Sequence, residues 1–174
     1  MIRPAVEKDS DVLTAISFAS KGYWNYPEGY FEIWKNELTI SEEYIQKNDV
    51  FVYESGTSVI GYYSVVNLEN DIKVSGITIK KGAWLDHMFI DPLNIGKGIG
   101  TILFNHMRKW CFDIAIREIG ILADPNSRGF YEKMGCIYQH EYPSTIEGRT
   151  TPYLQYYVGA LTSLYSGARG SCAR

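Results

Sequence analysis

A glycine-rich loop between an apolar strand and an amphipathic helix constrains this chain more than any other segment. Residues Ala83–Ile90 read as a strand, Pro92 ends it, and Gly98–Phe112 carry apolar side chains at helical spacing. Glycines stand at three alternate positions of the loop: Gly96, Gly98 and Gly100. Glycine lets the backbone approach a ligand, and the first N–H groups of a helix lack partners and attract anions. The segment therefore predicts a phosphate or pyrophosphate cradle beside the positive charge of Lys97; a simple connecting turn is the alternative.

Two common nucleotide-binding patterns are absent from this loop. Gly98 is followed by Ile99, so no Lys-Ser/Thr pair completes a P-loop. The third glycine of the dinucleotide-binding pattern is also missing after Gly98 and Gly100. Nucleotide hydrolysis and nicotinamide chemistry are therefore not expected.

Composition narrows the class of protein further. The 174 residues are 45 % apolar, which predicts one folded domain rather than a disordered chain, and no apolar run is long enough to span a membrane. A net charge of −3 argues against nucleic-acid binding. Acidic residues near the N-terminus are unlike a signal peptide. The cysteines are Cys111, Cys136 and Cys172, and they form no CxxC pair, so we expect neither a disulfide framework nor a metal site. This use of cysteine is typical of a reducing compartment, and we expect a cytoplasmic location.

Periodicity and turn signals predict a mixed α/β domain over residues 1–160, followed by a loose tail over 161–174. Thr39 and Glu42 fit a capping box at the start of a short helix. The segment Ile72–Lys80 is either a strand or a strand extension. Strands are expected over Ile2–Ala5, Val50–Glu54, Ser58–Leu68, Ala83–Ile90, Glu118–Ala123, Cys136–Tyr142 and Tyr153–Val158. Helices are expected after Asp9–Asp11, near Tyr30–Leu38, and over Tyr44–Lys47, Gly98–Phe112 and Ser127–Met134.

Two motifs, thirty residues apart, resemble the GCN5-related N-acetyltransferase (GNAT) superfamily. One is Ile90-Asp91-Pro92 followed by the glycine loop, and the other is Asn126–Gly135, which contains Phe-Tyr-Glu-Lys-Met-Gly. Two positions depart from the family pattern: Ile95 stands where Gln or Arg is usual, and Cys136 replaces the closing Phe. The resemblance implies an α/β GNAT fold, the acyl-CoA N-acyltransferase fold, with a mixed, mostly antiparallel central sheet flanked by helices.

The resemblance also implies acetyl-CoA as co-substrate, without a metal. It would lie in a V-shaped opening between the strands Ala83–Ile90 and Glu118–Ala123. Asn126 is the preferred further contact to the cofactor, because Asp124 can instead cap a helix. The backbone positions implied for the pantetheine arm are Met88, Phe89 and Ile90, and those for the pyrophosphate are Gly96, Lys97, Gly98, Ile99, Gly100 and Thr101.

Family members transfer acetyl by direct attack of an amine on the thioester, which needs a general acid and a general base. Tyr131 occupies the family's acid position; its alternative role is a core aromatic. Asp86 matches the position of side-chain bases in relatives. Strand alternation places Asp86 and His87 on opposite faces, with His87 toward the core. His87 or a water relay remain alternatives for the base.

The expected acceptor is a primary amine on a small molecule. Its binding walls are predicted in the early helices and in the late loop Tyr142–Pro152. A non-catalytic acyl-CoA-binding module and acetylation of a protein amine are the alternatives, and the net charge disfavours charged tRNA as acceptor. The strand Tyr153–Val158 offers a route to a homodimer. The candidate acceptor-binding residues are Trp24, Tyr26, Tyr30, His87 and Arg149.

Overall fold

The computed structural model describes residues 1–74 and 76–159, so the tail expected over 161–174, with Cys172, lies outside the described residues. The strands are β1 Ile2–Pro4, β2 Asp49–Ser55, β3 Ser58–Leu68, β4 Ile72–Val74, β5 Ile77–Ile79, β6 Gly82–Ile90, β7 Glu118–Leu122, β8 Ile137–Pro143 and β9 Thr150–Tyr157. The α-helices are α1 Ser10–Gly22, α2 Glu28–Leu38, α3 Glu42–Lys47, α4 Ile99–Asp113 and α5 Arg128–Lys133. Short 3-10 turns cover Glu7–Asp9, Pro92–Asn94 and Pro125–Ser127.

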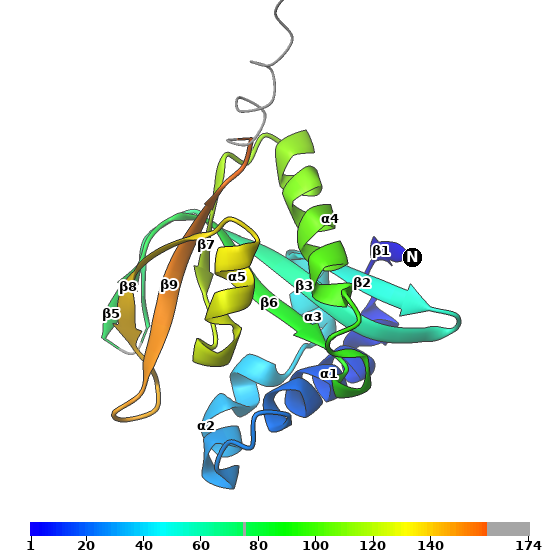
Figure 1. Cartoon of the computed structure of the whole chain (residues 1–174), viewed down its shortest axis with the longest axis horizontal. Helices are drawn as coiled ribbons and strands as arrows, with labels where there is room; N and C mark the ends of the chain where they lie inside the picture. Colours follow the sequence, from blue (N-terminus) through cyan, green and yellow to red (C-terminus); the bar gives the residue numbers. More distant parts are fainter. Residues whose placement is uncertain (75, 160–174) are drawn as a thin grey trace, which may run out of the picture.

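Seven strands form one central sheet in the order β1-β2-β3-β6-β7-β9-β8 (Figure 1). All neighbouring pairs are antiparallel except β6 and β7, which run parallel. The prediction of a mixed, mostly antiparallel sheet flanked by helices is therefore confirmed. None of the described helices is long and apolar enough to cross a membrane.

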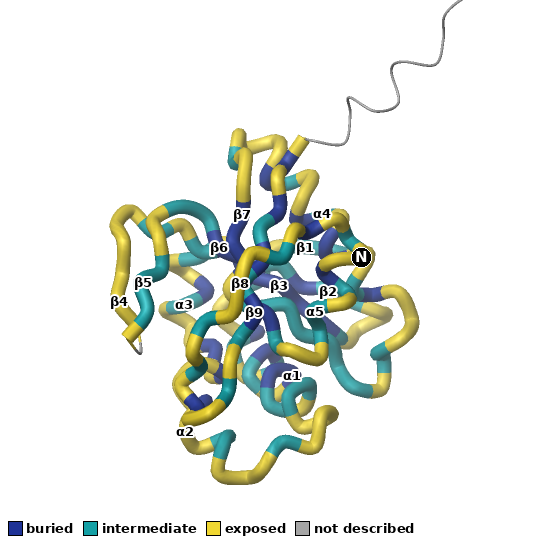
Figure 2. The backbone as a smooth tube through the Cα atoms, turned by 60° about the vertical axis from the view of Figure 1, so that its left-hand side comes forward, coloured by how far each residue is buried: buried dark blue, intermediate teal, exposed yellow. Residues whose placement is uncertain are grey.

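Helices cover both faces of this sheet. The buried stripe of α4, including Leu103, Phe104 and Met107, packs with Tyr131 of α5 in the larger core cluster. Leu13 of α1 and Ile45 of α3 pack on the other face, and α2 lies beside α1. Figure 2 shows the central strands mostly buried while the outer turns of the helices are exposed. The amphipathic patterns in the sequence thus bury one stripe of each helix against the sheet.

The parallel strands β6 and β7 separate soon after they meet. They pair only at Trp84 with Gly120 and at Leu85 with Ile121. Beyond Leu85, β6 continues beside β3, because Met88 and Ile90 stay in register with Tyr63 and Gly61. In the described part of the chain, one side of β6 beyond Leu85 therefore has no neighbouring strand, which gives the opening that the resemblance implies.

A β-bulge interrupts β6 next to this opening. Ser64 of β3 lies opposite His87 and Val65 lies opposite Leu85, so Asp86 is an extra residue. A bulge breaks the alternation of side chains, and Asp86 reaches the same cluster as His87. The expectation that Asp86 and His87 point to opposite faces is wrong for this reason.

Three local expectations need correction. The cap of α3 is Ser41, whose hydroxyl accepts from the Tyr44 N–H, while Thr39 ends α2. The segment Ile72–Lys80 forms a separate two-stranded hairpin of β4 and β5. Strand β9 lies between β7 and β8, so its backbone is already paired on both sides. The homodimer stays a prediction, but not through pairing of this strand.

Candidate functional site

A cavity of about 520 Å³ opens where β6 and β7 separate. Residues 85–89 of β6 form one wall, and the end of β7 with Tyr131 of α5 forms another. The C-terminal half of α2, Tyr44 of α3, the β4–β5 hairpin and the loop between β8 and β9 complete the lining. Its size is that of an ordinary small-ligand pocket.

Tyr44 stands at the centre of a hydrogen-bonded cluster in this cavity. Its hydroxyl donates to Oδ2 of Asp86 at 2.5 Å and lies 3.0 Å from Nδ1 of His87. The hydroxyl of Ser64 is within 2.8 Å of the Tyr44 hydroxyl and 3.0 Å of the same His87 nitrogen. Strands β3 and β6 and helix α3 thus hold Asp86 in one orientation. We refer to these four residues as the Asp86 cluster.

His87 is enclosed in this cluster and makes hydrogen bonds through both ring nitrogens. Its Nε2 donates to the Glu37 carbonyl oxygen at 2.9 Å, and its Nδ1 faces Oδ2 of Asp86 at 3.2 Å. Burial lowers the pKa of His87, but the hydrogen bond and charge of Asp86, with the Glu37 carbonyl, outweigh burial and raise it. Its side chain is 11 % exposed. His87 holds Asp86 and also lines the cavity, so its role as an acceptor contact stays a prediction.

Asp86 faces the cavity, and its side chain is 40 % exposed. The surrounding protein atoms tend to raise the pKa of this carboxyl, but the hydrogen bond and charge of His87 and the Tyr44 hydroxyl lower it overall. The carboxylate is thus ionised at neutral pH and open to a group that enters the cavity. It can take a proton or hold an ammonium group.

Tyr131 lies across the cavity in the core cluster and also in the cavity lining. Burial, followed by the nearby Cys136 and Asp124, raises the pKa of its phenol. Within the described part of the chain, its hydroxyl makes no hydrogen bond. The phenol therefore stays protonated and has its proton free for a group in the cavity.

The backbone of β6 next to the opening carries polar groups that have no partner strand within the described residues. The N–H of Asp91 donates to the Ile60 carbonyl of β3, so by strand alternation the main-chain groups of Met88 and Ile90 face away from β3. Phe89, between them, directs its backbone to β3. Met88 and Ile90 can thus hydrogen-bond a chain-like ligand lying along β6.

The glycine loop has the geometry of an anion cradle. Gly96 and Gly98 both have φ of 81°, a backbone conformation that suits glycine. A side chain at Gly100 would come within 3.2 Å of the Phe130 ring. Across residues 1–74 and 76–159, five N–H groups of this loop have no hydrogen-bond partner: those of Gly96, Gly98, Ile99, Gly100 and Thr101.

Two predicted cofactor contacts have other partners. The Lys97 ammonium group donates to the Asn94 side chain at 3.1 Å, at the exposed edge of the loop. The Asn126 amide donates to the Tyr26 hydroxyl at 2.8 Å and to Asp124 at 3.1 Å. Asp124 caps the turn Pro125–Ser127 by accepting from the Asn126 N–H, as the sequence suggested.

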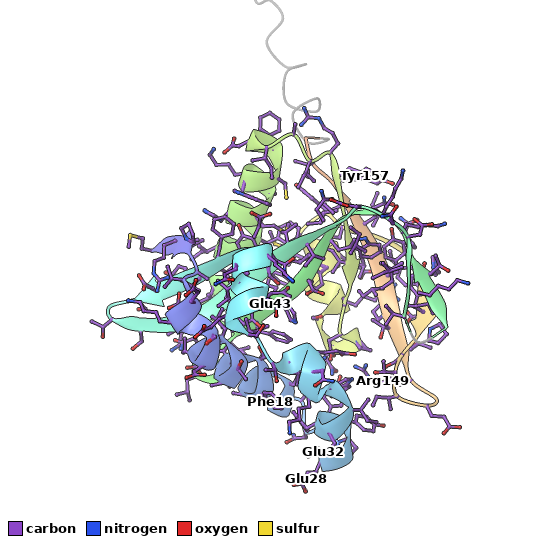
Figure 3. All side chains as sticks on the ribbon, turned by 180° about the vertical axis from the view of Figure 1, so that it is seen from behind. Phe18, Glu28, Glu32, Glu43, Arg149 and Tyr157 are labelled. Atoms are coloured by element: carbon purple, nitrogen blue, oxygen red, sulfur yellow. The ribbon has the colours of Figure 1, made fainter. Side chains whose placement is uncertain are left out.

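Asp124 is also the centre of a charged network at the end of β7. Oδ2 accepts from Lys21 at 2.8 Å and from Arg149 at 3.2 Å, and the carboxylate accepts from the Tyr26 hydroxyl. Burial tends to raise the pKa of Asp124, but the charge and hydrogen bond of Lys21, with the Asn126 N–H and the Tyr26 hydroxyl, lower it overall. Figure 3 shows Arg149 on the β8–β9 loop beside α2. The network joins α1, the segment before α2, β7 and this loop.

The predicted aromatic walls are only partly in place. Tyr26 belongs to the Asp124 network, and Tyr30 packs edge-on against Trp34. Trp24 packs against Tyr23 and is 39 % exposed. Trp24, Tyr26 and Tyr30 are all absent from the cavity lining, whereas Trp34 of α2 is part of it.

Sequence reasoning missed Tyr44, Lys21 and Glu37 as cavity residues. Tyr44 and Asp86 are 42 positions apart, and no local pattern connects them. The pKa of Glu37 is raised by burial although Lys21 and His87 oppose this. For Glu37, its place near the end of α2, next to the aromatic residues predicted to bind the acceptor, was a signal in the sequence. Among the described residues, no group of three or more His, Cys, Asp or Glu side chains could hold a metal ion.

The chain matches the model of a known family over residues 17–136, described as "Acetyltransferase (GNAT) family". A search of curated protein sequences finds no significant match.

Many solved structures share the fold. A GCN5-related N-acetyltransferase from Rhodopseudomonas palustris has a TM-score of 0.71 at 17 % identity, over 90 % of this chain and 94 % of that one. The PaiA N-acetyltransferase from Thermoplasma acidophilum, in complex with coenzyme A, has a TM-score of 0.68 at 16 % identity, over 90 % of this chain and 98 % of that one. At these identities the likeness shows the fold.

Proposed function

Since this chain belongs to the GNAT acetyltransferase family, we propose that it transfers the acetyl group of acetyl-CoA to a primary amine of a small molecule. The observation that carries the proposal is the cavity, which has an ionised carboxylate, Asp86, and a protonated phenol, Tyr131, in its lining. The volume of the cavity, about 520 Å³, is that of a small-ligand pocket and favours a small molecule over a protein amine as the acceptor. Two buried free thiols, Cys111 and Cys136, support a reducing compartment such as the cytoplasm.

Acetyl-CoA would lie along the free side of β6. The pyrophosphate would accept hydrogen bonds from the five loop N–H groups that have no partner among the described residues, with the dipole of α4 adding to the attraction. The pantetheine arm would pair with the main chain of Met88 and Ile90. The loss of a polar side chain at Ile95 leaves this loop to work through its backbone, and the glycines make that backbone accessible.

The transfer needs two proton movements. Asp86 accepts a proton from the entering ammonium group, directly or through water, and leaves a neutral amine. The amine nitrogen attacks the thioester carbon, forming the C–N bond, and the C–S bond then breaks. The Tyr131 hydroxyl donates a proton to the departing thiolate, and the excess proton on nitrogen passes to solvent. Proton exchange through water then restores the Tyr131 phenol and the Asp86 carboxylate, so that one proton is released for each amine acetylated. The products are an N-acetyl amine and coenzyme A.

Calorimetric binding of acetyl-CoA, desulfo-CoA and ATP is the first test. We expect micromolar binding of the two CoA compounds and none of ATP, followed by thiol release when amines are added. Binding of CoA without thiol release from any amine would favour a non-catalytic acyl-CoA-binding module. The absence of CoA binding would overturn the proposal.

A further inference from the structure

The β4–β5 hairpin turns one aliphatic face into the cavity. Cross-strand pairing places Ile72 opposite Ile79 and Val74 opposite Ile77, with Lys73 opposite Thr78 between them. Side chains alternate along a strand, so the four aliphatic residues share one face and Lys73 and Thr78 the other. All four aliphatic residues line the cavity, whereas Lys73 and Thr78 do not.

This aliphatic face is not part of the hydrophobic core. None of its four residues belongs to a core cluster of the described chain, and Ile72 and Val74 remain about two-fifths exposed. Figure 2 shows the hairpin at the margin of the molecule, with the backbone of β4 exposed. An isolated two-stranded hairpin has little stability of its own. Its four aliphatic residues face the cavity and not the core, and a contiguous apolar surface that is left exposed marks a binding site. An apolar ligand therefore explains this face better than packing does.

One carboxylate of the cavity is open, and the other charged side chains are occupied with one another. Asp124 pairs with both Lys21 and Arg149, and the three side chains are 12–15 % exposed. Glu37 lies within the electrostatic influence of these two cations. Asp86 is 40 % exposed and can hold one ammonium group. A second charge on the ligand would find no free partner among the described residues that line the cavity, and burying an unpaired charge is costly.

From these two observations we infer that the acceptor is a monoamine with an apolar carbon skeleton and no second charged group. The inference rests on the proposed acetyl transfer and names its substrate class. The amine nitrogen faces Asp86, and the alkyl or aryl body lies against Ile72, Ile77 and Ile79. In the reaction, the amine gains the acetyl group, and the released thiolate takes up a proton.

Three acceptors with the same six-carbon chain test this inference: hexylamine, 1,6-diaminohexane and 6-aminohexanoate. They differ only at the far end, which is apolar, cationic or anionic. With acetyl-CoA saturating, we expect kcat/KM for hexylamine to exceed that of each of the others by about tenfold or more, which is the preference of an apolar wall for apolar surface. Equal or better use of the diamine or the amino acid would overturn the inference.

Variants of the hairpin test whether its face is responsible. Ile77→Thr should lower kcat/KM for hexylamine about threefold to tenfold, through KM, without changing the KM of acetyl-CoA. The matched control, Thr78→Val on the other face, should leave both values unchanged; both changes keep a β-branched side chain. If Ile77→Thr and Thr78→Val changed kcat/KM for hexylamine equally, the aliphatic face of the hairpin would not be the surface that binds the acceptor.

The remaining outcomes separate this inference from the proposed function. If CoA compounds bind but hexylamine is not acetylated, the substrate class is wrong while the cofactor site stands. If CoA compounds do not bind, both are wrong. A dimer that dissociates on the Ile77→Thr change, measured by sedimentation, would assign the aliphatic face to a second copy of the chain and overturn the inference.

Discussion

At the scale of single residues, Tyr131 gives a direct test of the chemistry. The Tyr131→Phe change removes one hydroxyl that has no partner among the described residues and keeps the ring in its core position. We expect kcat for thiol release to fall by about two orders of magnitude, the usual contribution of a general acid. Acetyl-CoA binding, measured by calorimetry, should remain close to that of the unchanged protein. An unchanged kcat would remove Tyr131 from the mechanism.

His87 makes a prediction about stability and pH. Its raised pKa means that folding favours the charged imidazole, which faces Asp86 from β6, Tyr44 from α3 and Glu37 from α2. This stabilisation is complete below the ordinary pKa of about 6.5 and is lost as the pH rises through the raised value. In denaturant titrations, the free energy of unfolding should therefore decrease over that range.

The control for this prediction is His87→Asn, which cannot take up the proton. The difference in unfolding free energy between the two proteins should shrink as the pH rises through the raised pKa. Other titrating groups, such as His106 with its lowered pKa, are present in both proteins and cancel. If the difference in unfolding free energy between the two proteins stayed constant with pH, the pKa of His87 would not be raised in the folded protein.

At the scale of elements, the sequence predicts the order of helices and strands well, and its errors have identifiable causes. Apolar periodicity is a local property, so α4 and β6 were recognisable from their own residues. The bulge at Asp86 depends on how β6 aligns with β3, which no local pattern reports. The same limit applies to Tyr44, which reaches Asp86 only because α3 packs beside the sheet. The glycine loop at the start of α4 was therefore predictable, and the arrangement of the Asp86 cluster was not.

The short pairing of β6 with β7 makes a prediction about Gly120. A Cβ atom at this position would lie 2.7 Å from the indole ring of Trp84, which is buried. Gly120→Ala should therefore lower the free energy of unfolding by about 1–3 kcal/mol, because the ring must move. Chemical denaturation measures the change.

A second alanine substitution serves as the comparison for Gly120. Gly22, at the end of α1, has open space around it and no positive φ. Gly22→Ala should leave stability unchanged or raise it slightly. Equal losses in both variants would mean that the contact with Trp84 is not the cause.

At the scale of the whole molecule, the Asp124 network joins segments that are distant in sequence. Asp124 is 12 % exposed and holds Lys21 of α1 and Arg149 of the β8–β9 loop. Asp124→Asn leaves two partly buried cations without their counter-charge, so we expect a loss of about 3 kcal/mol in unfolding free energy. Hydrogen exchange should also become faster in the loop 144–149.

Asp113→Asn is the matched control for Asp124. Asp113 pairs with Lys109 on the outside of α4 and is 51 % exposed. Its removal should change stability by less than about 0.5 kcal/mol, as expected for a surface ion pair. If Asp124→Asn and Asp113→Asn lowered the free energy of unfolding by similar amounts, the burial of Asp124 and its two cationic partners would not be the reason for its effect.

The two residue pairs between β6 and β7 have a consequence for the order in which the molecule assembles. Strands β1, β2, β3 and β6 pair with one another within residues 2–90, and β7, β8 and β9 pair within residues 118–157. Pairings between residues close in sequence form quickly, and those between distant residues form slowly. The strands of each set are therefore expected to pair first, and the two sets to join later along a seam of two residue pairs and through the core cluster that they share. Because the cavity lies at this seam, we expect it to form after both sets of strands and to open early in unfolding.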